Sequence, residues 1–200
     1  TDITMDRSTG TLYLHRLNGS TAVGAVVIAV DTNGNLVKVM TSQARNYATG
    51  IEFVDGKLVL GERDGLQKMY VMNLDGSLVS EAPNPYKYNY GPRCLAYDDN
   101  NTLFQTCTFF PTAGGSLTEC YLITIDKNDL SKETGRLALN GPSGLINARA
   151  VEYDRADRNF WIGDFGGNIY KIAGFYYVAP PVTGIDEQKY TSANITVAPN

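Results

Sequence analysis

The feature that most constrains the fold of this 200-residue sequence is a strand–turn–strand phrase that recurs along the chain. Each copy carries alternating apolar residues into a turn of Asp, Asn or Gly, which is the usual sequence signal for a β-hairpin. A second strand-like phrase precedes each hairpin, and a fourth copy closes the series. The hairpins are residues 27–40, 69–81 and 121–133, and the strand-like phrases are residues 10–20, 56–66, 101–110 and 158–168.

A short strand ending in an acidic or Asn-rich turn stands ahead of each of these phrases, so the repeated unit has strands A to D. Strand A starts near Ile3, Ile51, Cys94 and Ala150. A four-stranded antiparallel unit repeated every ~40 to 56 residues is typical of the blades of a β-propeller. No window carries the periodicity of a helix. The sequence therefore predicts an all-β fold, a β-propeller of about four four-stranded antiparallel blades.

Composition agrees with a packed domain and argues against some partners. Hydrophobic residues make up 43% of the chain and charged residues 19%, so a buried core is expected. The net charge of −4 and the lack of a basic stripe argue against a nucleic-acid partner. No stretch reaches the ~20 apolar residues of a transmembrane helix. We therefore expect no nucleic acid and no transmembrane segment.

Two segments resemble known protein families. Residues 150–172, with a Tyr-Asp turn before a Phe-Trp-x-Gly strand, resemble a propeller repeat common in extracellular proteins. Residues 195–200 follow a polar linker and resemble the start of the C-terminal sorting domain of proteins exported by the type IX secretion system. The resemblance implies a bacterial protein that is secreted or held at the cell surface, with the secretion machinery as a partner of the sorting domain.

These observations divide the chain into residues 1–178, the propeller blades, and residues 179–200, a linker leading to a truncated sorting domain. Four blades form either a small closed ring or part of a larger ring. The fourth copy has no clear strand D, so another segment, such as the N-terminal strand, has to complete it.

Cys107 and Cys120 flank the loop between strands B and C of the third copy. A hairpin centred midway between them sets these positions opposite each other, where the β-carbons of antiparallel strands suit a disulfide. We therefore predict a Cys107–Cys120 disulfide, in keeping with export. The alternative is two small buried side chains in a reduced protein. Cys94 is about two residues out of register with Cys107 and is expected to be free.

The connections from strand D to the next strand A carry the candidate ligand-binding residues. Arg93 and Arg149 occupy matching places at the start of strand A in successive copies. With Arg45, Tyr47 and Tyr90, they are placed to line the mouth of the channel and hold an anionic or sugar-like ligand. The alternative is that each arginine pairs with a backbone carbonyl or a neighbouring acid at the blade edge.

Trp161, the only tryptophan, has two interpretations. An exposed Trp161 would offer an aromatic face for stacking on a sugar ring. It matches Tyr13, Val59 and Phe104 in the other copies, however, which alternate as an inward row of strand B. We therefore expect Trp161 to lie in the core between blades.

Few residues suggest catalysis. The only histidine, His15, has no histidine at the equivalent positions, so a nucleophilic triad has no support. Glu52 and Glu152 are acids that the channel could bring together for acid–base chemistry. The Asp/Asn-rich segments 31–35 and 126–129 lack the terminal Glu of a calcium loop and are better explained as turns. No catalytic residue, metal site or cofactor is predicted.

The preferred interpretation is a secreted or cell-surface, non-enzymatic propeller module that binds protein or glycan, or forms part of the surface structure. The alternative is an extracellular hydrolase or lyase with its site in the propeller channel.

Overall fold

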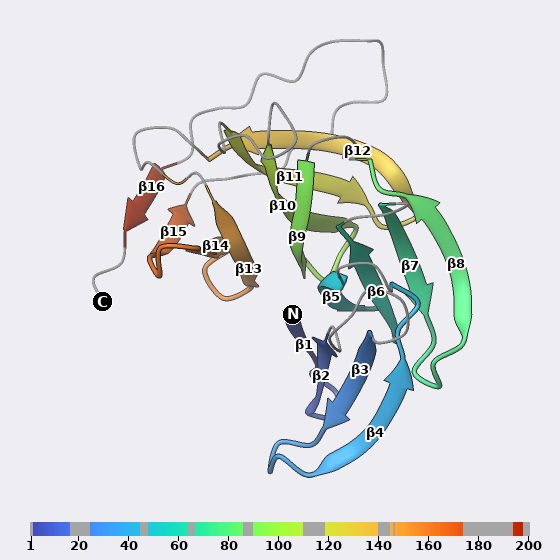
Figure 1. Cartoon of the computed structure of the whole chain (residues 1–200). Coiled ribbons are helices and arrows are strands. Elements are labelled where there is room, and N and C mark those ends of the chain that lie inside the picture. Colours follow the sequence, from blue (N-terminus) through green and yellow to red (C-terminus); the bar gives the residue numbers. More distant parts are fainter. Residues whose placement is uncertain are drawn as a thin grey trace.

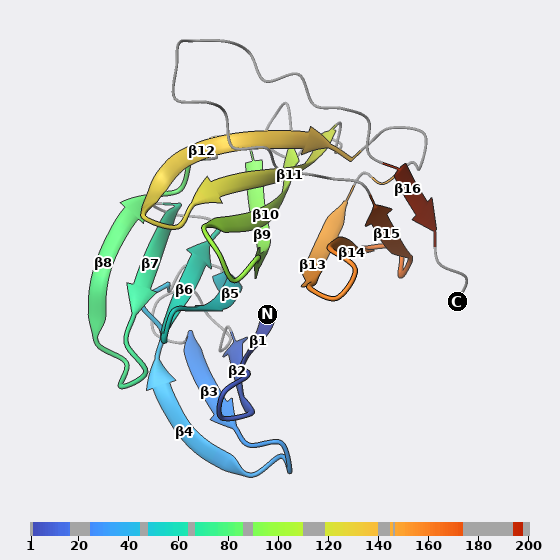
Figure 2. The same ribbon diagram turned by 180° about the vertical axis from the view of Figure 1, so that it is seen from behind.

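The computed structural model describes residues 2–16, 25–44, 48–63, 67–85, 90–109, 119–139, 145, 147–173 and 194–197. These residues form strands β1 to β16, and no helix occurs among them. The strands make four antiparallel sheets of four strands each. Figures 1 and 2 show the sheets as blades around a common axis, with β1, β5, β9 and β13 innermost. The predicted all-β propeller with four blades is therefore confirmed.

Each blade is built from consecutive strands in the order A to D. Blade 1 contains β1 (Asp2–Asp6), β2 (Thr11–Arg16), β3 (Val26–Val30) and β4 (Leu36–Thr41). Blade 2 contains β5 (Ala48–Val54), β6 (Lys57–Glu62), β7 (Lys68–Met72) and β8 (Leu78–Pro83). Blade 3 contains β9 (Tyr90–Tyr97), β10 (Thr102–Phe109), β11 (Glu119–Asp126) and β12 (Asp129–Ala138). Blade 4 contains β13 (Ala148–Asp154), β14 (Asn159–Asp164), β15 (Ile169–Ala173) and β16 (Asn194–Val197).

The fourth strand of blade 4 comes from the segment near the end of the chain. β16 pairs with β15, and Tyr170 faces Val197 in the register. The structure therefore completes this blade with residues 194–197 and not with the N-terminal strand, which is β1 of blade 1. The division at residue 178 and the sorting domain stay predictions.

The strand-to-strand turns follow the residue preferences seen in the sequence. Asp55 and Gly56 join β5 to β6 with φ angles of 46° and 77°, as a two-residue hairpin turn requires. In the turn after β3, the carboxylate of Asp31 accepts hydrogen bonds from the backbone N–H of Asn33 (2.9 Å) and of Asn35 (2.8 Å). This carboxylate therefore serves the turn itself, as expected for residues 31–35.

Three apolar clusters hold neighbouring blades together. Between blades 1 and 2, Tyr13 stacks on Phe53 with ring centroids 6.2 Å apart and planes 12° apart. Between blades 3 and 4, Phe104 stacks on Tyr153 at 5.9 Å and 16°. Val59 and Tyr97 belong to the cluster between blades 2 and 3. Each blade thus buries one face against the next, which is why a single blade cannot be stable alone.

The predicted Cys107–Cys120 disulfide is wrong. All three cysteines are free and buried. The register pairs Cys107 with Tyr121 and Thr108 with Cys120, one residue away from the symmetrical pairing that we expected. Because side chains alternate between the two faces of a strand, this offset places the two thiols on opposite faces of blade 3. Accordingly, Cys107 packs in the cluster with blade 2, and Cys120 packs in the cluster with blade 4.

In the part of the chain that the structure describes, no helix is long and apolar enough to cross a membrane.

Candidate functional site

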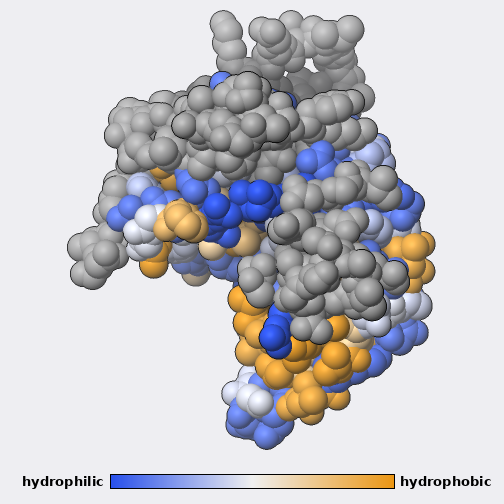
Figure 3. All heavy atoms as spheres, viewed as in Figure 1, coloured by the Kyte–Doolittle hydropathy of each residue, from blue (hydrophilic) through white to orange (hydrophobic). Residues whose placement is uncertain are grey.

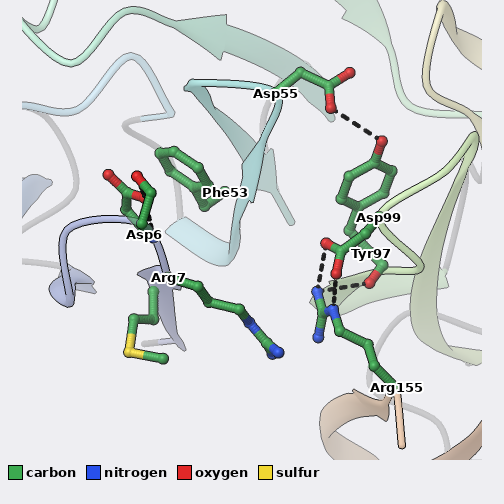
Figure 4. Close-up of a pocket in the computed structure, with 9 residues that line it drawn as sticks. Asp6, Arg7, Phe53, Asp55, Tyr97, Asp99 and Arg155 are labelled. Carbon is green, nitrogen blue, oxygen red and sulfur yellow. Dashed lines mark hydrogen bonds and ion pairs between the residues drawn. The ribbon is translucent and has the colours of Figure 1, made fainter.

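A pocket of about 310 Å³ opens at the mouth of the channel where the A-to-B turns of the four blades meet (Figure 4). All four blades contribute to it. Its lining residues are Met5, Asp6, Arg7, Ser8, Phe53, Asp55, Tyr97, Asp99 and Arg155. The side chains of Phe53 and Tyr97 provide apolar surface, and acids and arginines surround them. The pocket therefore combines aromatic surface with hydrogen-bonding groups, as ligand sites commonly do.

The acids of the pocket are placed by turn chemistry. Asp6 ends β1, and its Oδ1 accepts hydrogen bonds from the backbone N–H (2.9 Å) and the hydroxyl (2.7 Å) of Ser8. These hydrogen bonds hold the pKa of Asp6 below its usual value. Asp55 and Asp99 lie in the corresponding turns of blades 2 and 3 with positive φ angles, which Asp tolerates better than most residues. The repeat thus presents a carboxylate at the same end of successive blades.

Lys127 links blade 3 to blade 2 beside the pocket. Its Nζ lies 2.7 Å from Oδ2 of Asp55 and 3.0 Å from Oη of Tyr97. The hydrogen bond with Lys127 lowers the pKa of Asp55, and the same contact raises the pKa of Lys127. Asp55 is therefore ionised at neutral pH and held by Lys127.

Arg155 is the most extensively bonded cation in the described part of the pocket. Its Nη2 donates to the carbonyl oxygen of Tyr97 and to Oδ1 of Asp99, each at 2.9 Å, and its Nε also donates to Asp99. Burial lowers the pKa of Arg155, but the hydrogen bond and charge of Asp99 outweigh it, so the pKa is raised. Figure 4 shows the guanidinium of Arg155 meeting Asp99 beneath the ring of Tyr97.

Glu152 of blade 4 connects its own blade with blade 1. Its Oε1 lies 3.3 Å from Nη1 of Arg155 and 3.6 Å from Nη2 of Arg7. The side chain of Arg7 is 52% exposed, so its guanidinium has access to solvent on the pocket side. Arg7 is thus the pocket cation best placed to meet a ligand.

The channel also contains two acids whose pKa values are raised by burial. Burial raises the pKa of Asp2 to about 6, although its Oδ2 accepts hydrogen bonds from the backbone N–H of Ile51 (3.1 Å) and of Leu95 (3.3 Å). Burial, together with the charges of Glu152 and Asp2, raises the pKa of Glu52 well above its usual range. Through its two hydrogen bonds, Asp2 of β1 links the innermost strand of blade 1 to those of blades 2 and 3.

Glu52 and Glu152, the two acids considered for acid–base chemistry, interact electrostatically but, within the described ranges, do not belong to a metal site. Burial raises the pKa of Glu52 most, and the negative charge of Glu152 adds to this effect. Among the described residues, no group of three or more His, Cys, Asp or Glu side chains is arranged to hold a metal ion.

Arg93 and Arg149, the predicted ligand-binding residues whose side chains the structure describes, lie toward the other mouth of the channel. Arg149 is near the start of β13 and Arg155 follows its end, so the two are about 20 Å apart along an extended strand. Arg93 is buried, with Nη2 3.5 Å from Oγ1 of Thr108, and Arg149 lies over the ring of Phe165 at 5.0 Å. Burial and the charge of Arg63 lower the pKa of Arg149.

The other members of that predicted set are not described. Arg45 and Tyr47 lie outside the described residues. Tyr90 begins β9, and its side chain also lies outside the described part. The structure does not test whether these five residues bind a ligand, so their role stays a prediction.

The pocket at the A-to-B turns was not predicted from the sequence. Its residues are spread from Met5 to Arg155, and each looks like an ordinary strand or turn residue in its own blade. The available signal was the acidic residue that ends strand A in each copy, because equivalent turns of a propeller gather around one channel mouth.

Comparisons with known proteins concern the fold only. No protein-family model and no curated protein matches the sequence. Among solved structures, 324 chains match. One of these is the WD40 domain of Pan2 from Neurospora crassa, with 12% sequence identity and a TM-score of 0.48. The match covers 85% of this chain and 48% of that chain, so this chain spans about half the length of the Neurospora domain.

Proposed function

We propose that this chain is a non-enzymatic, extracellular propeller module that binds glycan or protein in the pocket at its A-to-B turns. The observation that carries the proposal is the convergence of all four blades on one pocket with two aromatic rings and an exposed arginine. Propeller architecture is consistent with a binding or scaffold module, because its turns gather at the channel mouths.

The size and chemistry of the pocket favour a small, partly polar group. A volume of about 310 Å³ is near the lower end of the range for ligand pockets, and it fits one sugar residue or one protruding side chain. Phe53 offers apolar surface for such a group, Tyr97 forms part of the pocket wall but is only 3% exposed, and Arg7 and the carboxylates offer hydrogen bonds. Asp55 and Asp99 already have cationic partners, so the pocket holds its polar groups in fixed positions.

A binding screen tests the proposal. The purified chain is applied to glycan and peptide arrays, and the best probe is titrated by calorimetry. We expect Arg7→Ala and Phe53→Ala each to weaken binding about tenfold, the equivalent of about 1.4 kcal/mol. Lys132→Ala, an exposed change on β12, is the matched control and should leave affinity unchanged. If Arg149→Ala removes binding and Arg7→Ala does not, the ligand occupies the mouth predicted from the sequence and this assignment is wrong.

A hydrolase or lyase is the second candidate, and the raised pKa of Glu52 beside Glu152 favours it. A carboxyl group that burial keeps protonated, with a second carboxyl group near it, is an arrangement that acid–base chemistry uses. The test incubates wild type and Glu152→Gln with the glycans that bind and measures released reducing ends. Turnover that Glu152→Gln abolishes would replace the binding proposal, and equal background from both proteins would support binding alone.

We also propose that the protein is exported by type IX secretion and resides in the medium or at the cell surface. The support is the resemblance of residues 195–200 to the start of a sorting domain after a polar linker. In a bacterium that carries this system, an antibody should find the protein outside the cell. In a strain without the translocon, the protein should accumulate in the periplasm, and unchanged release from that strain would refute the route.

A further inference from the structure

Among the described residues, no element packs on one face of the sheet of blade 1, and this face is apolar. We call the face that a blade turns toward the preceding blade its front face, and the opposite face its back face. The front face of blade 1 carries Ile3 and Met5, which are 50% and 39% exposed. Leu12, Leu14 and Ile28 are half-buried beside them. Figure 3 shows the apolar side chains gathered over this blade.

The same positions in blade 2 are buried against a neighbouring blade. The register pairs Ile3 with Leu14 in blade 1, as it pairs Ile51 with Leu60 in blade 2. In blade 2, Ile51 and Leu60 are fully buried in the cluster with blade 1. The exposed residues of blade 1 are therefore at positions that the repeat buries in a joint between blades.

No blade in the described part of the chain packs on the back face of blade 4, and Trp161 lies at the centre of this face. In the register, Trp161 pairs with Glu152 and Lys171, as Tyr13 pairs with Thr4 and Ala29. Trp161 is half-buried, and Lys171 lies over its ring at 5.2 Å. Trp161 thus occupies the position of Tyr13, as predicted, but it belongs to none of the three clusters between described blades, so the expected place in such a core is not observed.

Joints between blades use a repeated contact that these two open faces would complete. Tyr13 on a back face stacks on Phe53 on the next front face, and Phe104 stacks on Tyr153 in the same way. Trp161 is equivalent to Tyr13, and Met5 is equivalent to Phe53, so Met5 is the expected partner of Trp161 in such a contact. A methionine thioether against an aromatic ring is a favourable contact. The open back face and the open front face therefore carry the two halves of one joint.

We infer that the front face of blade 1 docks the Trp161 face of blade 4 from a second copy of this chain, forming a head-to-tail joint. The polar residues of the Trp161 face do not prevent this. Glu52, the equivalent of Glu152, is 5% exposed and pairs in register with Val59 of the cluster between blades 2 and 3, so the repeat buries a glutamate beside a joint at this position. Lys171 takes its own counter-ion, Asp157, into the joint. This surface meets the proposed binding site at Met5, which also lines the pocket, and at Glu152, which contacts Arg7 and Arg155 of the pocket.

A complementation experiment tests the joint with variants outside the pocket. Ile3→Lys blocks the front face, and Trp161→Lys blocks the back face. Sedimentation velocity should show that wild type self-associates, that each variant alone is monomeric, and that an equimolar mixture forms a species of twice the monomer mass. The mixture associates because each variant retains the face that the other has lost. Val79→Lys, an exposed change on β8, is the control and should associate like wild type.

Three results would overturn the inference. Wild type that stays monomeric at high micromolar concentration has no such joint. Trp161→Lys that self-associates as wild type does would show that blade 1 pairs with blade 1. A mixture that stays monomeric would show that the two open faces do not recognise each other. Circular dichroism of each variant separates loss of association from loss of fold.

Discussion

Lowering the pH should destabilise this protein through its only histidine. His15 lies on β2 and is fully buried. Its Nδ1 is 3.1 Å from the carbonyl oxygen of Gly50, and its Nε2 is 2.6 Å from Oγ of Ser42. The Ser42 hydroxyl also lies 2.9 Å from the carbonyl oxygen of Ala44. These partners can satisfy either the neutral or the charged ring, so the cost of protonation comes from burying the charge.

Burial lowers the pKa of His15 from 6.5 to about 4. An unfolded chain therefore binds a proton at a pH where the folded chain does not, and stability is lost as the pH falls from about 6.5 toward 4. At ~1.4 kcal/mol per pKa unit, the full loss is about 3 kcal/mol, and about 2.5 kcal/mol of it is reached by pH 4.5. A loss of that size is a large fraction of the stability of an ordinary domain.

Two measurements check this reasoning. The imidazole signals of His15 are followed by NMR between pH 7.5 and pH 4, and urea unfolding is measured across the same range for wild type and His15→Gln. Asp2 and Glu52 have raised pKa values and act in the opposite direction, so the difference between the two proteins isolates the histidine. A histidine signal in the folded protein that titrates near 6.5 would refute the argument.

Three further predictions concern packing and thiol chemistry. Phe160→Ala should lower the free energy of unfolding by about 3 to 5 kcal/mol in urea titrations, because Phe160 is 1% exposed and meets Phe104 edge-on at 4.5 Å. Phe165→Ala should lower the free energy of unfolding far less, because the ring of Phe165 is 73% exposed. Gly50→Ala should destabilise by about 1 to 3 kcal/mol in the same assay, because a Cβ there would come within 2.9 Å of the Arg93 carbonyl oxygen, whereas Gly61→Ala meets only ordinary contacts and should be tolerated. The three thiols should resist Ellman's reagent in the folded protein and all react in urea without reductant, and an oxidised pair in the mass spectrum would restore the disulfide.

The blades were predictable from the sequence because their signal is local. Alternating apolar residues and Asp/Asn/Gly turns specify a hairpin within about a dozen residues, and repetition specifies how hairpins stack. The register of β10 and β11 was less accessible, because a long loop separates Thr108 from Cys120 and its midpoint does not fix the pairing. An offset of one residue was enough to turn a predicted disulfide into two buried thiols on opposite faces.

The pocket was beyond local signals because it depends on which residues meet across blades. Asp99 and Arg155 are ordinary turn residues in their own copies, and only the ring brings the guanidinium to the carboxylate. The repeat also explains where specificity resides. Positions such as Ile51 and Val151 stay aliphatic because every joint needs them. The positions at the channel vary between blades instead: the one that holds Glu52 and Glu152 is Thr4 in blade 1, and the one that holds Arg7 and Arg155 is Asp55 in blade 2. Residues that break the repeat at a channel mouth are thus better guides to function in this chain than residues that keep it.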